Sequence, residues 1–434
     1  MRLLQTTGLR RASTLVSSRS RFLPSRLDRV EDIEDYQPRG FHPISIGDTF
    51  DHGRFRVLHK LGFGGSSTVW LARDHAHEQD SIVTLKALRS SLSSSSRSDQ
   101  QLPGELAISQ KIKDTFLPQP AKNFRIVDHH FSVVGPNGTH FFLVAPFAGP
   151  SIAALYDCPG RTSGSRRIRA DLARKVAKRT AQSLLDLHQA GIVHGGIFDH
   201  FEHPAPHMLT WSDAEVYAHL GNPKTETVQT NDGRPIGLTR PQHSWTLSKT
   251  PDYTTLPSSK KAAPSSATSD NPTSQPQLLH PPTRTLINYI SPEARFTRRA
   301  SFEADVWSLG CAIFEIRAGF PLFEPFLGSD AIILKKTVET LGRLPDPWWN
   351  AFAQRKVWFE EDGRPKSQEE HERAGVMLTS RKTSIREKLL EIGKDVDEPF
   401  EEEGPFIEKA YMEMTEGEAD MLTDLLEKML KYRP

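Results

Sequence analysis

The stretch Lys60-Leu61-Gly62-Phe63-Gly64-Gly65-Ser66-Ser67-Thr68-Val69-Trp70-Leu71 decides the fold of this chain. It predicts a strand, a glycine-rich turn and a second strand, because β-branched and aromatic residues flank three glycines and two serines. Alternation over residues 54–61 places Phe55, Val57 and His59 on one face of the first strand. Glycines at such a tip let the backbone come within hydrogen-bond distance of an anion, since no Cβ intervenes. A hairpin of this kind can lie over the phosphates of a nucleotide, although a plain tight turn has the same pattern.

A lysine inside an apolar strand follows the hairpin. Residues 81–88 read Ser-Ile-Val-Thr-Leu-Lys-Ala-Leu and predict a third strand with Lys86 among apolar neighbours. A lysine in that setting is costly unless an anion or a carboxylate meets its ammonium group. Glu105 comes next and shares one helical stripe with Ile108 and Ile112. Glycine-rich hairpin, strand lysine and helix glutamate follow one another in the order found in protein kinases.

The residues around this hairpin resemble the fungal branch of the SR-protein-kinase family. The likeness rests on residues 36–48 and 60–74, with Ser67 where other kinases have a third glycine, and it extends with one gap to the end of the chain. The resemblance implies an α+β, bilobal fold with a β-rich N-lobe (residues 36–148) and a mainly helical C-lobe (residues 149–434). It also implies phosphoryl transfer from ATP to serine in Arg/Ser-rich splicing proteins by a monomeric enzyme.

By the same resemblance, the ATP cradle combines the hairpin, the strand lysine, the helix glutamate and a hinge at residues 145–151. Pro146 has no N–H and keeps only its carbonyl, so the Ala148 N–H is the expected donor to adenine. Ala145 would be the small residue at the back of the pocket, and a simple domain linker is the alternative. The expected nucleotide-binding residues are Leu61, Gly62, Phe63, Gly64, Gly65, Ser66, Ser67, Thr68, Val69, Lys86, Glu105, Pro146 and Ala148.

Helical patterns dominate the second half of the chain. An apolar stripe predicts a helix over residues 169–189, which leads through Ile192-Val193-His194 into the catalytic loop of the family pattern. Residues 301–318 match the buried central helix of the large lobe, where Asp305 would hold that loop through backbone N–H groups. Strands are expected over residues 124–134 and 140–146, and further helices over residues 213–220, 330–341 and 385–392. The acidic residues 398–420 favour a solvated loop and helix face.

The groups that would carry the chemistry are missing from their expected places. A kinase needs a carboxylate near the substrate hydroxyl, and an asparagine and a second aspartate for magnesium. Here His194 is followed by two glycines, so that Gly196 stands where the family has the catalytic aspartate and Phe201 where it has the asparagine. No Asp-Phe-Gly or Asp-Leu-Gly precedes Pro292. No intact catalytic residue and no metal ligand is predicted, which weighs against magnesium binding but not against ATP.

Nearby residues are poor candidates to replace the missing catalytic base and metal ligands. Asp199 is the closest carboxylate, but it would need a rebuilt loop to act as the base. Asp252 follows a segment that is poor as a buried strand. Prolines at 204 and 206 break any helix that would align three nearby histidines as metal ligands, so a solvated loop is favoured. These histidines are His200, His203 and His207.

Composition places few limits on the chain. Its 434 residues suffice for one large or two ordinary domains, and a net charge of +1 gives no general attraction to nucleic acid or membrane. Hydrophobic residues make up 37% and the mean hydropathy is −0.49, so part of the chain must stay outside any core. Cys158 and Cys311 lie far apart, which implies no disulfide framework and fits a reducing compartment. No apolar run is long enough to span a bilayer.

Two segments are expected to lie outside the lobes of the family pattern, and the C-lobe is expected to be incomplete. Residues 1–35 predict a disordered basic segment, and 1–27 have transit-peptide composition, which makes the mitochondrion an alternative to cytoplasm or nucleus. Residues 250–285 predict a disordered insert rich in Ser and Pro. The chain stops at Pro434, before a family helix whose arginine pairs with the glutamate at the position of Glu293. An incomplete C-lobe with this carboxylate unpaired is therefore expected.

Three hypotheses follow from these residues. The first is an SRPK-like pseudokinase that keeps the ATP cradle and has lost most catalysis. The second is an active Ser/Thr kinase whose sequence carries a mis-joined exon at residues 195–207 and 258–280. The third is a docking module without nucleotide, in which Lys86 and Glu105 form only a structural ion pair.

Overall fold

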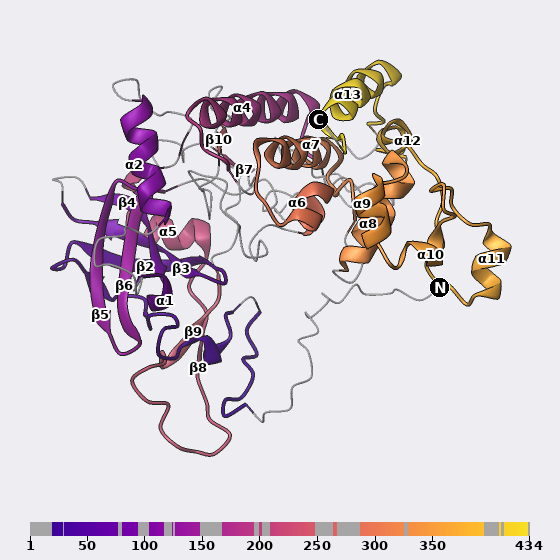
Figure 1. Ribbon diagram of the computed structural model, residues 1–434. Coiled ribbons are helices and arrows are strands. Elements are labelled where there is room, and N and C mark those ends of the chain that lie inside the picture. The colour runs from indigo at the N-terminus through magenta and orange to yellow at the C-terminus, as the bar shows by residue number, and fades with distance from the viewer. Residues whose placement is uncertain are drawn as a thin grey trace.

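The computed structural model shows two lobes, one built on a β-sheet and one on helices (Figure 1). This is the α+β, bilobal architecture expected from the sequence. No helix in the part of the chain that the structure describes is long and apolar enough to cross a membrane. The described residues are 20–28, 30–76, 80–93, 104–116, 124, 126–147, 167–194, 199–201, 209–247, 264–266, 287–324, 329–394, 408 and 412–432.

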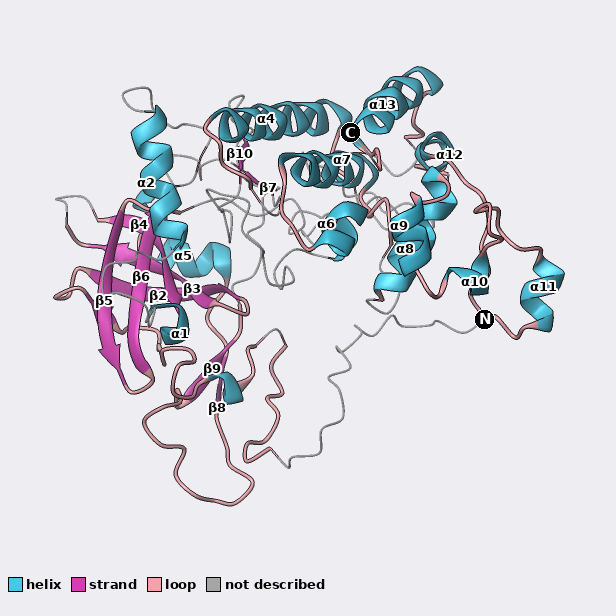
Figure 2. Cartoon of the chain, in the orientation of Figure 1, coloured by secondary structure: helices cyan, strands magenta, loops and turns pink. Residues whose placement is uncertain are grey.

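The small lobe is a six-stranded antiparallel sheet in the order β1-β2-β3-β4-β6-β5, with a helix packed beside it (Figure 2). The expected hairpin is confirmed as β2 and β3, and the expected lysine strand is confirmed as β4. The elements are β1 (Thr49–Phe50), β2 (Phe55–Phe63), β3 (Ser67–Asp74), β4 (Ser81–Leu88), α1 (Ser90–Ser93), α2 (Gly104–Phe116), β5 (His129–Gly135) and β6 (Gly138–Pro146).

One strand starts later than the sequence predicts. The pattern predicted a strand over residues 124–134, whereas β5 begins at His129. The reason is that helix α2 takes the backbone groups of Val127, since Lys113 Nζ donates to its carbonyl at 2.7 Å and its N–H donates to Ser109 Oγ at 3.2 Å. Backbone groups used in this way are not available for strand pairing.

The two faces of the hairpin pack against different neighbours. Phe55, Val57 and Trp70 belong to the core on one face of the sheet, while Leu58 and Leu71 belong to a separate cluster on the other. His59 was expected on the face of Phe55 and Val57. It lies instead with Leu71, its direct partner on β3, because the register shifts between Val57 and His59. A β-bulge of this kind turns the following side chain to the opposite face.

The large lobe is built around α7, and the helices predicted over residues 301–318 and 330–341 are confirmed. Helices α4 and α13 pack on α7, and Gly310 allows the close contact because an added Cβ would lie 3.1 Å from the Leu430 side chain. The helices are α4 (Ala170–Gln189), η4 (Ile287–Tyr289), α6 (Pro292–Thr297), α7 (Phe302–Ala318), α8 (Asp330–Leu341), α9 (Asp346–Ala351), α10 (Arg355–Trp358), α11 (Gln368–Arg373), α12 (Ile385–Leu390) and α13 (Glu416–Met429).

The segment 209–247, which follows the catalytic-loop position of the family pattern, lies against the small lobe. It carries α5 (Asp213–Leu220) and a ribbon of β8 (Thr225–Thr227) and β9 (His243–Trp245), all of which lie beside the sheet (Figure 1). The helix expected over residues 213–220 is confirmed as α5. Within the predicted insert 250–285, the structure describes Pro264–Ser266 as β10, which pairs with β7 (Asp199–Phe201). The rest of that insert lies outside the described residues.

Part of the N-terminal segment assigned to disorder also has a defined position. Residues 20–28 and 30–35 end in the short helix η1 (Ile33–Asp35), and Phe22 is buried. Glu31 pairs with Lys60, a fully buried lysine of β2, and Tyr36 donates its hydroxyl to the same carboxylate. A carboxylate held by two buried groups anchors this segment on the small lobe, since an unpaired buried lysine is costly.

His42 and His140 form a buried pair in the small lobe, with ring centroids 4.9 Å apart. Burial and the neighbouring His140 lower the pKa of His42 to about 4, and burial also lowers the pKa of His140. The folded state thus favours the neutral rings. Their contribution to stability is fully present above the ordinary histidine pKa and is lost as the pH falls below it.

We expect His42→Phe to flatten the acid limb of the stability profile. The His42 shift corresponds to about 3 kcal/mol of unfolding free energy lost between pH 7 and pH 4. Phenylalanine keeps the ring contacts with Phe50 and Phe142 and has no titrating group. Urea unfolding of both proteins at pH 7, 6, 5 and 4 measures the effect. Equal pH dependence of the two proteins would show that His42 is not a source of acid sensitivity.

Candidate functional site

Lys86 and Glu105 meet between the sheet and helix α2. Lys86 Nζ lies 2.8 Å from Glu105 Oε2, and the two side chains are 13% and 12% exposed. Lys86 faces Val69 on β3 and Leu143 on β6 across the sheet, so the strand register fixes its depth. The pair places a fixed ammonium group under the hairpin, where it can bind an anion or serve as a structural ion pair.

The tip of the hairpin presents bare backbone. An added Cβ at Gly64 or Gly65 would meet nothing within 4 Å, and neither residue has a positive φ. The fold therefore needs glycine at these positions neither for space nor for backbone conformation. What glycine provides there is an uncovered peptide that an external group can approach closely. The arrangement suits a phosphate lying under the turn.

The base of the turn is more firmly held than its tip. Gly64 N–H donates to the Ser67 carbonyl at 3.0 Å, and the Arg89 N–H donates to the Ser66 carbonyl at 2.8 Å. Ser66, Ser67 and Thr68 are buried, whereas Phe63 is 38% exposed at the tip. The hairpin thus combines anchored strands with an open end.

Asp305 holds the segment that leads into the catalytic loop. Its carboxylate is 1% exposed and accepts from the His194 N–H at 2.6 Å and interacts with His188 Nε2 at 3.1 Å. The contact of Asp305 with a backbone N–H, expected from the resemblance, is confirmed at His194. Helix α7 therefore determines where the catalytic segment starts.

The structure describes some of the predicted site residues and not others. The hairpin residues 61–69, Lys86 and Glu105 lie together around one end of the sheet, and Pro146 pairs with Val83 at the end of β6. Gly196, Ala148 and Asp252 lie outside the described residues, as do His203 and His207. Asp199, His200 and Phe201 are described only as backbone of β7.

The sequence did not single out the contacts that fasten the hairpin. Lys60 was treated as part of the turn motif, yet it is fully buried against Glu31. Asp213 was assigned only to a helix, yet it binds Arg56 of β2 and Arg73 of β3. The available signal for Lys60 was a charged residue inside an apolar strand, the same signal that identified Lys86.

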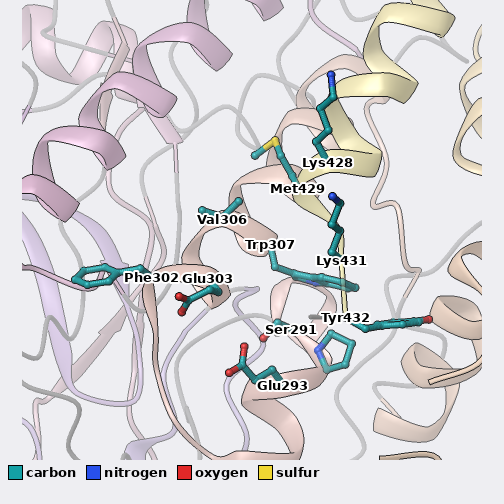
Figure 3. A pocket seen from close by; sticks show the side chains of 11 residues that line it. Ser291, Glu293, Phe302, Glu303, Val306, Trp307, Lys428, Met429, Lys431 and Tyr432 are labelled. Carbon is teal, nitrogen blue, oxygen red and sulfur yellow. The ribbon is translucent and has the colours of Figure 1, made fainter. Parts of the chain in front are cut away.

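A pocket of about 200 Å³ lies in the large lobe between α6, α7 and the end of α13 (Figure 3). Glu293 and Glu303 both line it, and burial together with Glu303 raises the pKa of Glu293. Trp307 and Tyr432 form an aromatic side of the same pocket. It lies away from the hairpin and from Lys86, so it is not the nucleotide cradle. Among the described residues no group of three or more His, Cys, Asp or Glu could hold a metal ion.

Known relatives of the chain are protein kinases. No family model matches it. Protein kinase dsk1 of Schizosaccharomyces pombe is 30% identical over 204 residues, which are 46% of this chain and 35% of that protein. Serine/threonine-protein kinase SRPK of Physarum polycephalum is 26% identical over 358 residues, 77% of this chain and 78% of that protein. SRSF protein kinase 3 of Homo sapiens is 32% identical over 124 residues, 28% of this chain and 20% of that protein.

The fold, the Lys86–Glu105 pair and these relatives define a chain of the protein kinase superfamily. Within it the chain is SRPK-like, related to the serine/threonine kinases of that family. Kinases of this kind imply ATP as cofactor. The chain spans about a third or less of the length of several of these relatives, including dsk1, so their activities, substrates and partners do not pass to it directly.

We predict that Asp305→Ala destabilises the large lobe by about 2–4 kcal/mol, because it removes a buried charged acceptor and leaves the His194 N–H unsatisfied. Asp305→Asn should cost less, since an amide oxygen can still accept. Chemical unfolding followed by tryptophan fluorescence measures both. Asp424→Ala is the matched control, because its pair with Lys428 is solvent-exposed and should contribute less than about 1 kcal/mol. Equal losses for Asp305→Ala and Asp424→Ala would contradict the role given to Asp305.

Proposed function

We propose that this chain is an SRPK-like protein that binds ATP and transfers its γ-phosphoryl group poorly or not at all. The observation that supports binding is the Lys86–Glu105 pair beneath an uncovered glycine tip. The observation that supports lost transfer is Gly196 at the position of the catalytic aspartate, with no Asp-Phe-Gly or Asp-Leu-Gly before Pro292.

Nucleotide binding would use groups that remain in the chain. ATP would supply the phosphates. Lys86 would bind them as a cation whose position Glu105 fixes, and the peptide group of Gly65 would approach them from the turn. The Pro146 carbonyl and the Ala148 N–H would take the adenine edge. None of these contacts depends on the missing carboxylates.

Phosphoryl transfer would lack two of its contributors. A positioned general base typically contributes a factor of about 10²–10⁴ to the rate, and glycine at 196 supplies none. Loss of the magnesium aspartate also removes charge neutralisation at the transferring phosphate. Such losses need not add, but together they bring the rate toward background. For the same reason, tight magnesium binding is not part of the proposal.

The partners proposed for the chain are Arg/Ser-rich splicing proteins, which a pseudokinase would bind without modifying. Support comes from a relative named as a kinase of SRSF proteins, SRSF protein kinase 3 of Homo sapiens. Cytoplasm or nucleus is the proposed location, with the mitochondrion as the alternative that the basic segment 1–27 suggests.

We expect ATP to raise the melting temperature of the full chain by a few degrees. Ligand at 100 times its Kd adds about 2.7 kcal/mol to the free energy of unfolding. For a chain of this size, that raises the melting temperature by about 2–4 °C. Lys86→Met should remove the shift, while Lys428→Met on the exposed face of α13 should keep it. Thermal-shift titrations with and without magnesium test this. An unshifted wild-type protein would contradict nucleotide binding and favour the docking module.

Transfer to an Arg/Ser-repeat peptide should be at least about 100-fold slower than that of an active relative such as dsk1 assayed in parallel. Radiolabelled ATP gives the required sensitivity. Gly196→Asp tests the cause, since it returns a carboxylate to the expected position. Rapid turnover by the wild-type chain that Lys86→Met abolishes would contradict the proposed loss of activity.

A further inference from the structure

Residues 209–247 contact both faces of the sheet that carries the glycine-rich hairpin. We call them the insert clamp. Helix α5 packs on one face, where Trp211, Val216 and Leu220 form a buried cluster with Leu58 and Leu71. At the other end of the insert clamp, Trp245 packs against the core that contains Phe55, Val57 and Trp70. Figure 2 shows α5 and the β8–β9 ribbon beside the strands of the hairpin.

Asp213 fastens the insert clamp to both strands of the hairpin. Arg73 of β3 donates from Nε and Nη2 to Asp213 Oδ1 at 3.0 and 2.8 Å, and Arg56 of β2 donates from Nη2 to Oδ2 at 2.6 Å. Arg56 and Arg73 are direct cross-strand partners, so one carboxylate bridges the pair. Arg73 also donates to the Trp211 carbonyl at 2.6 Å. Burial opposes the charge of Asp213, but the two arginines outweigh it and lower the pKa of this carboxyl.

Further contacts continue along β2 toward the turn. Tyr217 donates its hydroxyl to the Leu58 carbonyl at 3.3 Å, and His59 Nε2 lies 3.1 Å from the Gly221 carbonyl. The His59 imidazole is 1% exposed, so this contact is shielded from water. Leu61, where the glycine-rich segment begins, packs against the same cluster as Trp211. The contacts of the insert clamp therefore extend along β2 to Leu61, where the glycine-rich segment begins.

The insert clamp also holds the N-terminal segment that covers Lys60. Arg240 pairs with Glu34 at 3.1 Å and lies over the Phe22 ring at 4.5 Å. Asn137 of the β5–β6 turn donates to the Phe41 carbonyl and to the Thr239 carbonyl, at 2.7 and 2.6 Å. Through Glu31, this segment neutralises Lys60, whose ammonium group lies 5.4 Å from the rings of Phe63 and Trp70.

We infer that the insert clamp is a second connection, besides the hinge, between the catalytic segment and the glycine-rich hairpin, with Asp213 as its positioning residue. The chain runs from His194 through residues 195–208 directly into the insert clamp. A hairpin held on both faces has fewer open conformations, and a ligand beneath it then loses less conformational entropy on binding. The consequence for ATP affinity rests on the proposed function, whereas the consequence for hairpin motion does not.

The test compares hydrogen exchange of the full-length wild-type chain and Asp213→Asn by mass spectrometry. Asparagine keeps the size and removes the charge that two arginines share, so amides of residues 55–74 should exchange about tenfold faster. Exchange in α4 and α7 should not change. Asp213→Glu retains a carboxylate and should restore most of the protection. Asp171→Asn is the matched control, since its pair with Arg169 is exposed on α4.

The second readout is the Kd of ATP measured by calorimetry, which should rise about five- to tenfold in Asp213→Asn and stay unchanged in Asp171→Asn. Unchanged exchange of residues 55–74 in folded Asp213→Asn overturns the inference. If Asp213→Asn does not fold, Tyr217→Phe decides, because it removes a single hydroxyl contact with Leu58. Faster hairpin exchange in Tyr217→Phe supports the inference, and wild-type exchange overturns it.

The two proposals fail in different ways. A wild-type chain that binds no ATP contradicts the proposed function, while the exchange result still reports on the insert clamp. A chain that binds ATP equally well with and without Asp213, and whose hairpin exchanges equally, contradicts the insert clamp and leaves nucleotide binding intact.

Discussion

The Lys86–Glu105 ion pair is the constraint on which the small lobe depends. It joins the middle of the sheet to helix α2 with both side chains nearly buried. Removing one partner of such a pair leaves an uncompensated buried charge and typically costs about 3–5 kcal/mol. Helix α2 also holds Val127 through Lys113 and Ser109, which delays the start of β5. Through helix α2, the ion pair therefore links β4, which carries the lysine, to the start of β5 at the far edge of the sheet.

Features that depend on local sequence could be predicted. The hairpin, the lysine strand and the central helix follow from residue patterns within about twenty positions, and the structure has them where expected. Glu105 was found because helical spacing placed it beside Ile108 and Ile112. The His59 prediction was wrong because a register shift in β2 depends on pairing with β3, and strict alternation along one strand does not contain that information.

Contacts between distant segments could not be predicted. Asp213 and Arg73 are 140 positions apart, and Lys60 and Glu31 are 29 apart with no motif that joins them. In the large lobe, Arg317 and Arg167 both pair with Glu408, at 2.7 and 2.9 Å, although they lie 91 and 241 positions away from it in the sequence. Charged residues are common, so a sequence offers each of them many partners. Burial selects the pairs, because a charge that leaves water must be compensated.

The kinase residues that this chain keeps stabilise the fold, whereas the catalytic residues proposed to be lost would not. Asp305 holds a backbone N–H and Glu105 compensates a buried lysine, so both stabilise the folded state whether or not any reaction occurs. A catalytic carboxylate has no such duty, and groups that serve only chemistry often reduce stability. The proposed loss of the base and the magnesium aspartate is thus compatible with an intact fold. Gly64 and Gly65 do not fit this explanation, because neither space nor backbone conformation requires them. An anion that approaches the turn would explain their presence, and this favours the proposed nucleotide binding over a module that only docks.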